Sequence, residues 1–342
     1  MRREIGSEFW DVPIAKEENS LFLRKMEWFI SGTAALEQIL EDILTYRIIR
    51  VAAIPSWCCS SMIIPYIKRG IRVVFYPVWV DPDEGLIVDY RCTEECDTTL
   101  RLDYFGYSTQ KKIGNATGII IEDLTHSLLS GGTQKEADYY FGSLRKWAGF
   151  YTGGYAWKKG EWHATLPKGR TDMRYIRLRM DAMEQKKRYI MGESVSKEYL
   201  DLFEKGEEFL DLCEVLSGYE EDIKRAEYLD ISMIKTRRRE NAKALLNSFK
   251  DHAVFKEVDS GDCPLFVPLN ISNEIRDGLR SYLISKEIYC PIHWPVTEYH
   301  KLDDQTELLY RKEISIVCDQ RYNECDMNRI IDEVKKYLSR RA

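Results

Sequence analysis

Two charged side chains stand where an α/β protein would present groups to a ligand. Asp123 follows an apolar, strand-like run at 119–121, and Lys146 follows another strand-like run at 137–142. Open α/β sheets bind ligands outside the carboxyl ends of their strands, so we expect Asp123 to face a crevice. A glycine-rich stretch at 149–154 comes after Lys146. A lysine beside glycines at a strand end indicates a tight loop that faces a ligand.

Both residues also have simpler interpretations. Asp123 could only cap the turn that follows its strand. Lys146 could lie on the surface, as most lysines do, although its aromatic and glycine neighbours argue against this. The residues alone leave these alternatives open.

A helix start offers a third chemical feature. Gly32, Thr33 and Ala34 begin a segment whose apolar residues recur at helical spacing. The N–H groups and the positive dipole end of a helix N-terminus bind phosphate. The simpler interpretation is that Ser31 or Thr33 merely caps this helix.

The elements around these residues alternate between strand and helix through the first half of the chain. This alternation predicts an α/β fold with a mostly parallel sheet covered by helices. Short apolar runs predict six strands, and helical spacing predicts two crossover helices. The strands are expected at 47–54, 71–78, 98–105, 118–122, 137–143 and 154–157, and the helices at 34–44 and 60–68.

The second half of the chain predicts linking helices and a second lobe. Charged, helix-favouring sequence runs from about 195 to 249, and its basic run at 235–239 is interpreted as a solvated helix face. The last hundred residues return to mixed strand and helix. We expect a large domain at 1–230, which includes the linking helices from about 195, and a small domain at 231–342.

The composition is that of a soluble globular protein. The 342 residues are 44% hydrophobic and 31% charged, with a net charge of −6. This balance gives no reason to expect nucleic-acid or anionic-membrane binding. The sequence shows no apolar run of about 18 residues and no signal-peptide pattern, so we expect a cytoplasmic protein without a membrane span.

The cysteines indicate reduced thiols and no metal site. Nine cysteines are scattered irregularly along the chain, which is not the pattern of a disulfide framework. Cys92 and Cys96 are the nearest approach to a metal-binding pair. No second Cys or His pair follows at finger spacing, so we expect no metal.

Several motifs together resemble a known family of enzymes. Asp123 ends a strand with His126 three residues later, and Lys146 is followed by Gly153 and Gly154 seven and eight residues on. This spacing resembles the DegT/DnrJ/EryC1/StrS family of fold-type-I aminotransferases, which use pyridoxal phosphate (PLP). Further segments resemble the family in the same order, at 31–36, 55–59, 70–75, 283–294 and 314–322, while 166–230 matches only loosely.

The resemblance implies a fold and a cofactor site. The implied fold has a large lobe with a mostly parallel seven-stranded sheet sandwiched by helices, and a smaller C-terminal α+β lobe. Lys146 would hold PLP as a Schiff base and then move the substrate proton, while Asp123 would keep the pyridine nitrogen protonated. His126 would bond the phenolic oxygen of PLP, and the helix start at 32–34 would hold its phosphate.

The chain departs from the family at two positions of this site. Many relatives carry Ser five residues before the Lys, where this chain has Phe141, so Ser143 could contact the phosphate instead. The aromatic residue that stacks on the pyridine ring commonly lies four residues after the Pro of the second strand, and Cys59 occupies that position. Trp57 lies two residues earlier and could stack on the ring, or it could fill the core.

Two residues of the small lobe are candidates for contact with the substrate. A fixed cation at Arg321 or His293 would suit the carboxylate of an amino donor or a sugar-nucleotide phosphate. Both could instead be ordinary interface residues.

The resemblance implies a homodimeric aminotransferase. It would move an amino group from an amino acid, expected to be glutamate, to a keto acceptor, expected to be a nucleotide-linked sugar. Some relatives have His in place of the Lys and act as dehydratases, so Lys146 favours transamination. A PLP-dependent lyase, a non-sugar aminotransferase and a catalytically silent binding protein of this fold remain alternatives, although the last would not need both Asp123 and Lys146.

Overall fold

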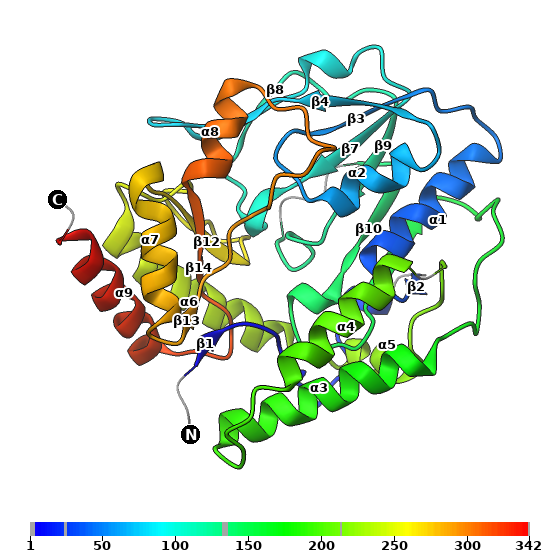
Figure 1. Ribbon diagram of the computed structural model, residues 1–342. Coiled ribbons are helices and arrows are strands. Elements are labelled where there is room, and N and C mark those ends of the chain that lie inside the picture. Colours follow the sequence, from blue (N-terminus) through cyan, green and yellow to red (C-terminus); the bar gives the residue numbers. More distant parts are fainter. Residues whose placement is uncertain (1–3, 24–25, 132–135, 213, 341–342) are drawn as a thin grey trace. The chain divides into compact units, whose positions relative to one another are not determined.

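The computed structural model describes residues 4–23, 26–131, 136–212 and 214–340 (Figure 1). Within these residues the chain forms two compact units. Unit 1 contains Glu4, Glu8–Ile48 and Asp138–Ile231, and unit 2 contains Ile5–Ser7, Ile49–Ala137 and the chain from Ser232 onward. The expected division into domains at 1–230 and 231–342 stays a prediction.

Unit 1 contains three antiparallel strands with a helix packed on them. β11 (Gly154–Lys158) pairs with β10 (Tyr139–Ser143) on one side and with β2 (Glu27–Phe29) on the other. α1 (Gly32–Leu44) contacts β10 and β11. It buries the apolar residues that the helical spacing indicated, namely Leu36, Ile39, Leu40 and Ile43.

Unit 1 continues with three further helices. α3 (Met173–Met191) ends at Gly192, whose positive φ of 82° suits a glycine. α4 (Tyr199–Leu212) packs along α3, and α5 (Glu220–Glu227) follows it (Figure 1). The contact between α3 and α4 is rich in aromatic side chains, including Tyr189, Tyr199 and Phe203. A short 3-10 turn, η1 (Ser20–Leu23), lies near the N-terminus.

Unit 2 contains four parallel strands in the order β9-β7-β3-β4. They are β3 (Val51–Pro55), β4 (Arg72–Tyr76), β7 (Thr98–Leu102) and β9 (Ile119–Asp123). Parallel strands are usually covered on both faces, which explains why β3 and β9 are rich in buried apolar residues. α2 (Ser60–Ile67) contacts β3 and β4.

Three smaller sheets complete the strands of unit 2. In the first, β6 pairs antiparallel with β5 and parallel with β8, and the other two sheets are the antiparallel pair β12–β14 and the parallel pair β1–β13. Their bounds are β1 (Ile5–Gly6), β5 (Val78–Asp81), β6 (Gly85–Asp89), β8 (Lys111–Ile113), β12 (Phe266–Asn270), β13 (Ile288–Tyr289) and β14 (Glu313–Val317).

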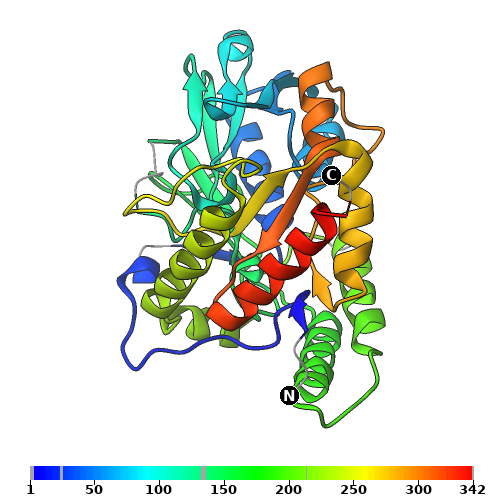
Figure 2. The same cartoon turned by 90° about the vertical axis from the view of Figure 1, so that its left-hand side faces the viewer.

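The remaining helices of unit 2 lie in its C-terminal part. They are α6 (Ile231–Phe249), α7 (Asn273–Ile284), α8 (Asp304–Lys312) and α9 (Glu324–Leu338). α7 and α9 lie side by side in both views (Figures 1 and 2). α9 begins with a capping box, in which Asn323 and Asp326 exchange side-chain to backbone hydrogen bonds. The 3-10 turns η2 (Arg91–Thr93) and η3 (Tyr104–Gly106) follow β6 and β7.

The predicted fold class is confirmed. All six predicted strands and both predicted helices are present, and the chain alternates between them as an α/β protein does. Three strands in unit 1 and four in unit 2 account for the seven that the resemblance implied. The strand predicted at 47–54 begins later, at Val51, and Arg47, Ile48 and Arg50 before it are exposed to solvent.

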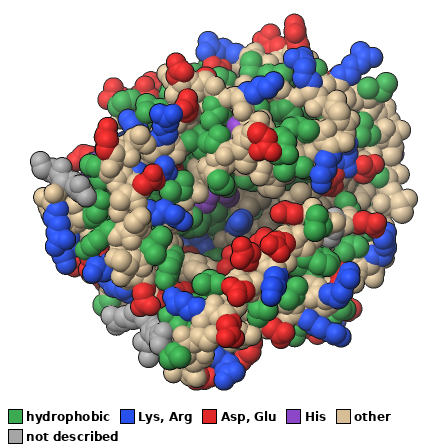
Figure 3. Space-filling view, in the orientation of Figure 1, with side chains coloured by type: hydrophobic (Ala, Val, Ile, Leu, Met, Phe, Trp, Pro, Cys, Tyr) green, Lys and Arg blue, Asp and Glu red, His purple; other side chains and the backbone are tan. Residues whose placement is uncertain are grey.

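Acidic and basic side chains are interspersed on the face shown in Figure 3. The eight cysteines within the described ranges are free thiols, and Cys213 lies outside these ranges. No helix of the described chain is long and apolar enough to cross a membrane. In the same residues, no group of three or more His, Cys, Asp or Glu side chains is arranged to hold a metal ion.

Candidate active site

The residues predicted for cofactor and substrate fall in both units. In unit 1 are the helix start at 32–34, Ser143 and Lys146. In unit 2 are Trp57, Cys59, Asp123, His126, His293 and Arg321. The structure therefore defines two groups of side chains, one in each unit.

The start of α1 keeps two backbone N–H groups for an anion. Ser31, and not Thr33, caps the helix, because its Oγ accepts the Ala34 N–H at 3.1 Å. The first N–H groups of any helix lack intrahelical partners. The amides of Gly32 and Thr33 are thus the ones that a phosphate could use.

Two glycines let three segments of unit 1 meet at this helix start. A Cβ on Gly32 would lie 3.3 Å from the Cβ of Ser143. A Cβ on Gly154 would lie 2.0 Å from the carbonyl oxygen of Ser31, a distance that no side chain can adopt. The start of α1, the end of β10 and the start of β11 therefore converge. Ser143 consequently lies beside the helix N-terminus, where a phosphate-binding hydroxyl is expected.

Lys146 ends a short 3-10 turn, η4 (Leu144–Lys146), directly after β10. The Leu144 N–H donates to the carbonyl oxygen of Gly153 at 2.8 Å, and the following residue, Trp147, is fully buried. Lys146 itself is exposed. A well-anchored turn with an exposed amine suits a group that must react with a ligand.

Ion pairs surround the residue that precedes Lys146. Arg145 pairs with Glu207 of α4, and Arg179 of α3 lies 3.3 Å from Glu207 and 3.5 Å from Glu8. Burial raises the pKa of Glu8, but the charges of Arg179 and Arg145 outweigh this and lower it. Lys146 contributes to the same lowering, so its amine lies within electrostatic range of Glu8. Burial lowers the pKa of Arg179, the most enclosed member of the network.

In unit 2, Asp123 ends β9 and is only 5% exposed. Its Oδ1 accepts the Thr125 N–H at 2.8 Å, which is the turn-capping role named as the alternative. A carboxylate has about four acceptor positions on two oxygens, so this bond is compatible with a second role in holding a cationic ring nitrogen.

The neighbouring Glu122 belongs to a different environment. Its Oε2 accepts the Nε–H of Arg101 at 2.5 Å. Burial and the charge of Asp103 raise the pKa of Glu122 to about 7, although Arg101 opposes the rise. Successive strand residues point to opposite faces, so Glu122 and Asp123 serve different sides of the sheet.

His126 lies in a cluster of aromatic rings from separate segments of unit 2. Its ring stacks on Phe105 at a centroid distance of 4.8 Å and on Trp294 at 5.6 Å. Its Nδ1 accepts the Phe105 N–H at 3.4 Å, so the ring proton belongs on Nε2. The Nε2–H is the donor needed for the phenolic oxygen of PLP, the role that the resemblance implies.

Trp57 and Cys59 lie in different surroundings. Trp57 is fully buried, stacks on Tyr104 at 4.9 Å, and donates its indole N–H to the carbonyl oxygen of His293 at 2.6 Å. These contacts agree with the alternative interpretation of Trp57, in which its side chain fills the core. Cys59 caps α2 and is half-buried, with its Sγ 2.8 Å from the Ser61 Oγ. Contact of either residue with the cofactor ring stays a prediction.

His293 joins the same aromatic cluster as His126. Their ring centroids lie 6.2 Å apart, and the rings of Phe105 and Trp294 both lie 5.1 Å from His293. Its Nδ1 is 2.8 Å from the Ser315 Oγ. The structure thus brings two of the predicted site residues, His126 and His293, together within unit 2.

Arg321 is engaged with a nearby carboxylate. Its Nε and Nη2 donate to the two oxygens of Asp319 at 2.9 and 2.8 Å, and Nη2 also donates to the carbonyl oxygen of Ser7 at 3.1 Å. Burial would raise the pKa of Asp319, but Arg321 holds it below its usual value. The bidentate pair favours the structural interpretation, and a substrate contact of Arg321 stays a prediction.

Phe105 and Trp294 are site residues that the sequence analysis missed. Phe105 is fully buried and adopts a φ of 53°, a strained conformation for a residue with a side chain. Such outliers cluster at functional sites. Their positions in the sequence could have indicated them. Phe105 lies shortly after the end of β7, and Trp294 directly follows His293.

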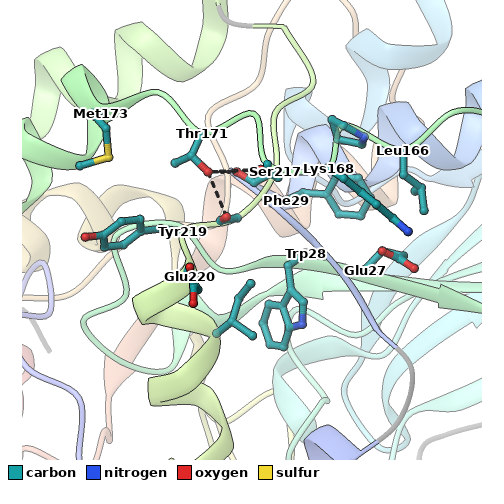
Figure 4. Close-up of a pocket in the computed structure, with 14 residues that line it drawn as sticks. Glu27, Trp28, Phe29, Leu166, Lys168, Thr171, Met173, Ser217, Tyr219 and Glu220 are labelled. Atoms are coloured by element: carbon teal, nitrogen blue, oxygen red, sulfur yellow. Dashed lines mark hydrogen bonds between the residues drawn. The ribbon is translucent and has the colours of Figure 1, made fainter.

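Unit 1 also contains a pocket of about 610 Å³ beside β2 (Figure 4). Its wall is mixed, with the aromatic residues Trp28, Phe29 and Tyr219 and the charged residues Glu27 and Lys168 among the lining residues. Thr171 Oγ1 donates to the carbonyl oxygen of Gly218 at 3.1 Å and so joins two segments of the rim. None of the predicted site residues is among those that line this pocket in the described chain.

Taken separately, the side chains of each unit suit one part of PLP in their chemistry. Unit 1 offers amide donors and the Ser143 hydroxyl for a phosphate, and the exposed amine of Lys146 for an aldehyde. Unit 2 offers the buried carboxylate of Asp123 for a pyridinium nitrogen and the Nε2–H of His126 for a phenolic oxygen. The convergence at Gly32 is the observation that supports the phosphate end, because it places Ser143 beside the helix amides.

Comparison with known proteins identifies the fold. No protein-family model matches the chain, and no curated protein matches it in sequence. Many solved structures match most of it, and three of them serve as examples. The DegT DnrJ EryC1 StrS aminotransferase of Brucella abortus is 16% identical, with a TM-score of 0.57 over 92% of this chain and 86% of that one.

The other two structures are similar in extent. Helicobacter pylori PseC, an aminotransferase involved in the biosynthesis of pseudoaminic acid, is 14% identical, with a TM-score of 0.62 over 97% of this chain and 100% of that one. Bacillus subtilis NtdA, solved with bound PMP, is 13% identical, with a TM-score of 0.62 over 92% and 74%. The chain therefore has the fold of these proteins, as the resemblance implied.

Proposed function

We propose that the chain is a PLP-dependent aminotransferase that moves an amino group from glutamate to a nucleotide-linked keto sugar. The observation that carries this proposal is the convergence in unit 1 of the α1 start and Ser143, one turn before Lys146. Phosphate-binding amides and a reactive amine are the groups needed to hold PLP at both ends. The sugar acceptor is supported by the family resemblance and by the likeness to PseC.

The roles of the binding residues follow from their chemistry. Bound PLP would supply an electron sink for the charge that develops at the Cα of the amino acid. The amides of Gly32 and Thr33 and the Ser143 hydroxyl would donate to the phosphate oxygens. Asp123 would accept a hydrogen bond from the pyridine N–H and keep that proton in place. His126 would donate its Nε2–H to the phenolic oxygen.

Lys146 would serve two purposes with one atom. Its Nζ would hold the cofactor before the donor arrives, and after displacement the same Nζ would take the proton from the donor Cα and deliver it to the cofactor carbon that receives the amino group. The anchored turn η4 limits where this amine can move. The ion pair of Arg145 with Glu207 adds to that anchoring.

We also propose that the enzyme is a cytoplasmic homodimer. The dimer rests on the family resemblance. The free thiols of the described cysteines support a reducing compartment.

Absorption spectra of the purified protein test the proposal. With added PLP, the wild type should absorb above about 400 nm, and L-glutamate should shift the band to about 330 nm as the cofactor takes the amino group. Lys146→Ala should lack the first band, whereas Lys187→Ala, which removes an exposed lysine of α3, should keep it. A band that depends on Lys146 but does not shift when glutamate is added would refute either glutamate as the amino donor or transamination as the reaction. The absence of any such band in the wild type would refute the whole proposal.

A further inference from the structure

A carboxylate, a hydroxyl and an imidazole form a continuous line of hydrogen bonds in unit 2. Ser315 Oγ donates to Glu313 Oε1 at 2.5 Å, and His293 Nδ1 lies 2.8 Å from the same Oγ. Glu313 and Ser315 lie on β14 and are fully buried. The proposed transamination assigns no role to either residue.

The number of available protons decides which group donates and which accepts in each of these hydrogen bonds. A carboxylate only accepts, so the single hydroxyl proton of Ser315 goes to Glu313. Ser315 Oγ must then accept from the Nδ1–H of His293. His293 therefore carries its proton on Nδ1, and Nε2 is the nitrogen left to accept a hydrogen bond from a ligand.

The same carboxylate also fixes the backbone of His293. Glu313 Oε2 accepts the His293 N–H at 2.7 Å, and the His293 carbonyl oxygen accepts the indole N–H of Trp57 at 2.6 Å. Both peptide groups of His293 are thus bound by side chains. Both oxygens of Glu313 are hydrogen-bonded, as a fully buried carboxylate requires.

Aromatic rings line the surroundings of the imidazole. The ring centroids of Phe105, Phe266 and Trp294 lie 5.0 to 5.1 Å from that of His293. The His293 side chain remains 12% exposed. Trp294 also lines a pocket of about 870 Å³. The negative face of an aromatic ring attracts the C–H groups of a sugar, and a sugar hydroxyl can donate to an imidazole nitrogen.

We propose that Glu313 and Ser315 position His293 so that its Nε2 accepts a hydrogen bond from a hydroxyl of the sugar acceptor, packed against Trp294. The sugar in this statement rests on the proposed function. Glu313 and Ser315 are positioning residues, because they act through His293 and do not touch the substrate. A fixed acceptor of this kind discriminates against an analogue that lacks the hydroxyl, since Nε2 is then left without its donor.

Nitrogen NMR on 15N-histidine-labelled protein tests the position of the proton. The chain has five histidines, so His293 can be assigned by the signal that His293→Asn removes. The wild type should show the proton on Nδ1, and Ser315→Ala should move it to Nε2 because Nδ1 has lost its acceptor. Ser339→Ala, which changes an exposed serine after α9, should leave it on Nδ1. A wild-type proton on Nε2, or no response to Ser315→Ala, would overturn the proposal.

Glu313→Gln tests the carboxylate separately at nearly constant size. A glutamine amide can also donate a hydrogen bond to the Ser315 oxygen. The Ser315 hydroxyl is then free to donate its proton to His293 Nδ1 instead of to residue 313. The fixed Nδ1–H state should then become a mixture of the two tautomers. An unchanged tautomer in folded Glu313→Gln would overturn the role of Glu313. Ser315→Ala removes a single oxygen and keeps the test decisive if Glu313→Gln does not fold.

The ligand is tested with TDP-glucose as a hydroxyl-bearing probe. Its affinity for the protein loaded with pyridoxamine phosphate should fall about tenfold in Ser315→Ala, the value of one hydrogen bond. Equal affinity in both proteins, or no binding to the wild type, would overturn the sugar contact. The tautomer is read without cofactor or substrate, so it is independent of the proposed function. If the wild type has the Nδ1–H tautomer but shows no band above about 400 nm, the proposed transamination is contradicted. The proposed positioning of His293 by Glu313 and Ser315 is then still supported.

Discussion

A Cβ on Gly154 would lie 2.0 Å from the carbonyl oxygen of Ser31. Gly154 is the first residue of β11, and Ser31 is the residue that caps α1. Their contact therefore joins the start of a strand to the helix N-terminus that we assign to phosphate binding. The shape of that site depends on the absence of a side chain at 154.

Gly154→Ala should disrupt this contact. The added methyl group must displace the backbone, which we expect to lower the free energy of unfolding by about 3 kcal/mol. Urea unfolding gives the change. Gly160→Ala is the matched control, because Gly160 has a φ of 82° and a Cβ added there would meet nothing within 4 Å. It should lose only about 1 kcal/mol through backbone strain. Equal losses at the two positions would contradict the close approach.

Ser143→Ala should weaken the binding of a phosphate and nothing else. Loss of one hydrogen bond to a charged group predicts about a tenfold rise in the Kd of pyridoxamine phosphate, which binds without a covalent link. Isothermal calorimetry measures this Kd. Pyridoxamine, which lacks the phosphate, is the control ligand and should bind both proteins equally. A loss of the same size for both ligands would place Ser143 away from the phosphate.

Glu207→Gln should destabilise unit 1. Arg179 is only 1% exposed and would keep its charge with less compensation, while Arg145 would lose its partner. We expect a loss of about 2 kcal/mol in unfolding free energy, less than for a fully buried pair because Glu207 is half exposed to solvent. Glu208→Gln, at the next and exposed position, should change stability by less than about 0.5 kcal/mol. Similar effects of the two substitutions would argue against the network.

Glu122 should make stability depend on pH. Its pKa in the folded protein is about 7, above the ordinary value of 4.5, because of burial and the charge of Asp103. The folded state thus binds this proton more tightly, so the stabilisation is present below pH 4.5 and is lost as the pH rises through about 7. Glu122→Gln should flatten this fall, which we expect to reach about 2 kcal/mol between about pH 5 and 8.

Urea unfolding at several pH values measures this dependence. Asp103→Asn removes a cause of the raised pKa and should move the fall to lower pH. A wild type whose stability rises over this pH range would contradict the assignment.

The turn that carries Lys146 could be predicted from the sequence because its signals are local, whereas its approach to the start of α1 joins residues far apart in the chain. Ser143 ends β10 and Lys146 ends the turn directly after it, while Gly154 begins β11, which pairs with β10. A strand end, a tight turn and a helix start have sequence signals that do not depend on distant contacts. The cofactor roles of these residues stay predictions.

The aromatic cluster could not be predicted in the same way. Trp57 stacks on Tyr104, and His126 stacks on Trp294, which is far away in the sequence. Such contacts depend on how separate strands and loops pack, which a single sequence does not encode locally. The hydrogen bond of His293 to Ser315 is also of this kind. The pair of Asp319 with Arg321 was foreseeable, because the two residues are only two positions apart.

The most direct test of the central claim is chemical trapping at Lys146. Borohydride reduction of the PLP-loaded protein makes the bond between lysine and cofactor permanent, and peptide mass mapping then locates it. We predict one modified peptide, which contains Lys146, and no modification at that site in Lys146→Arg. Modification of a different lysine, or none in the wild type, would contradict the assignment of Lys146 as the residue that holds the cofactor.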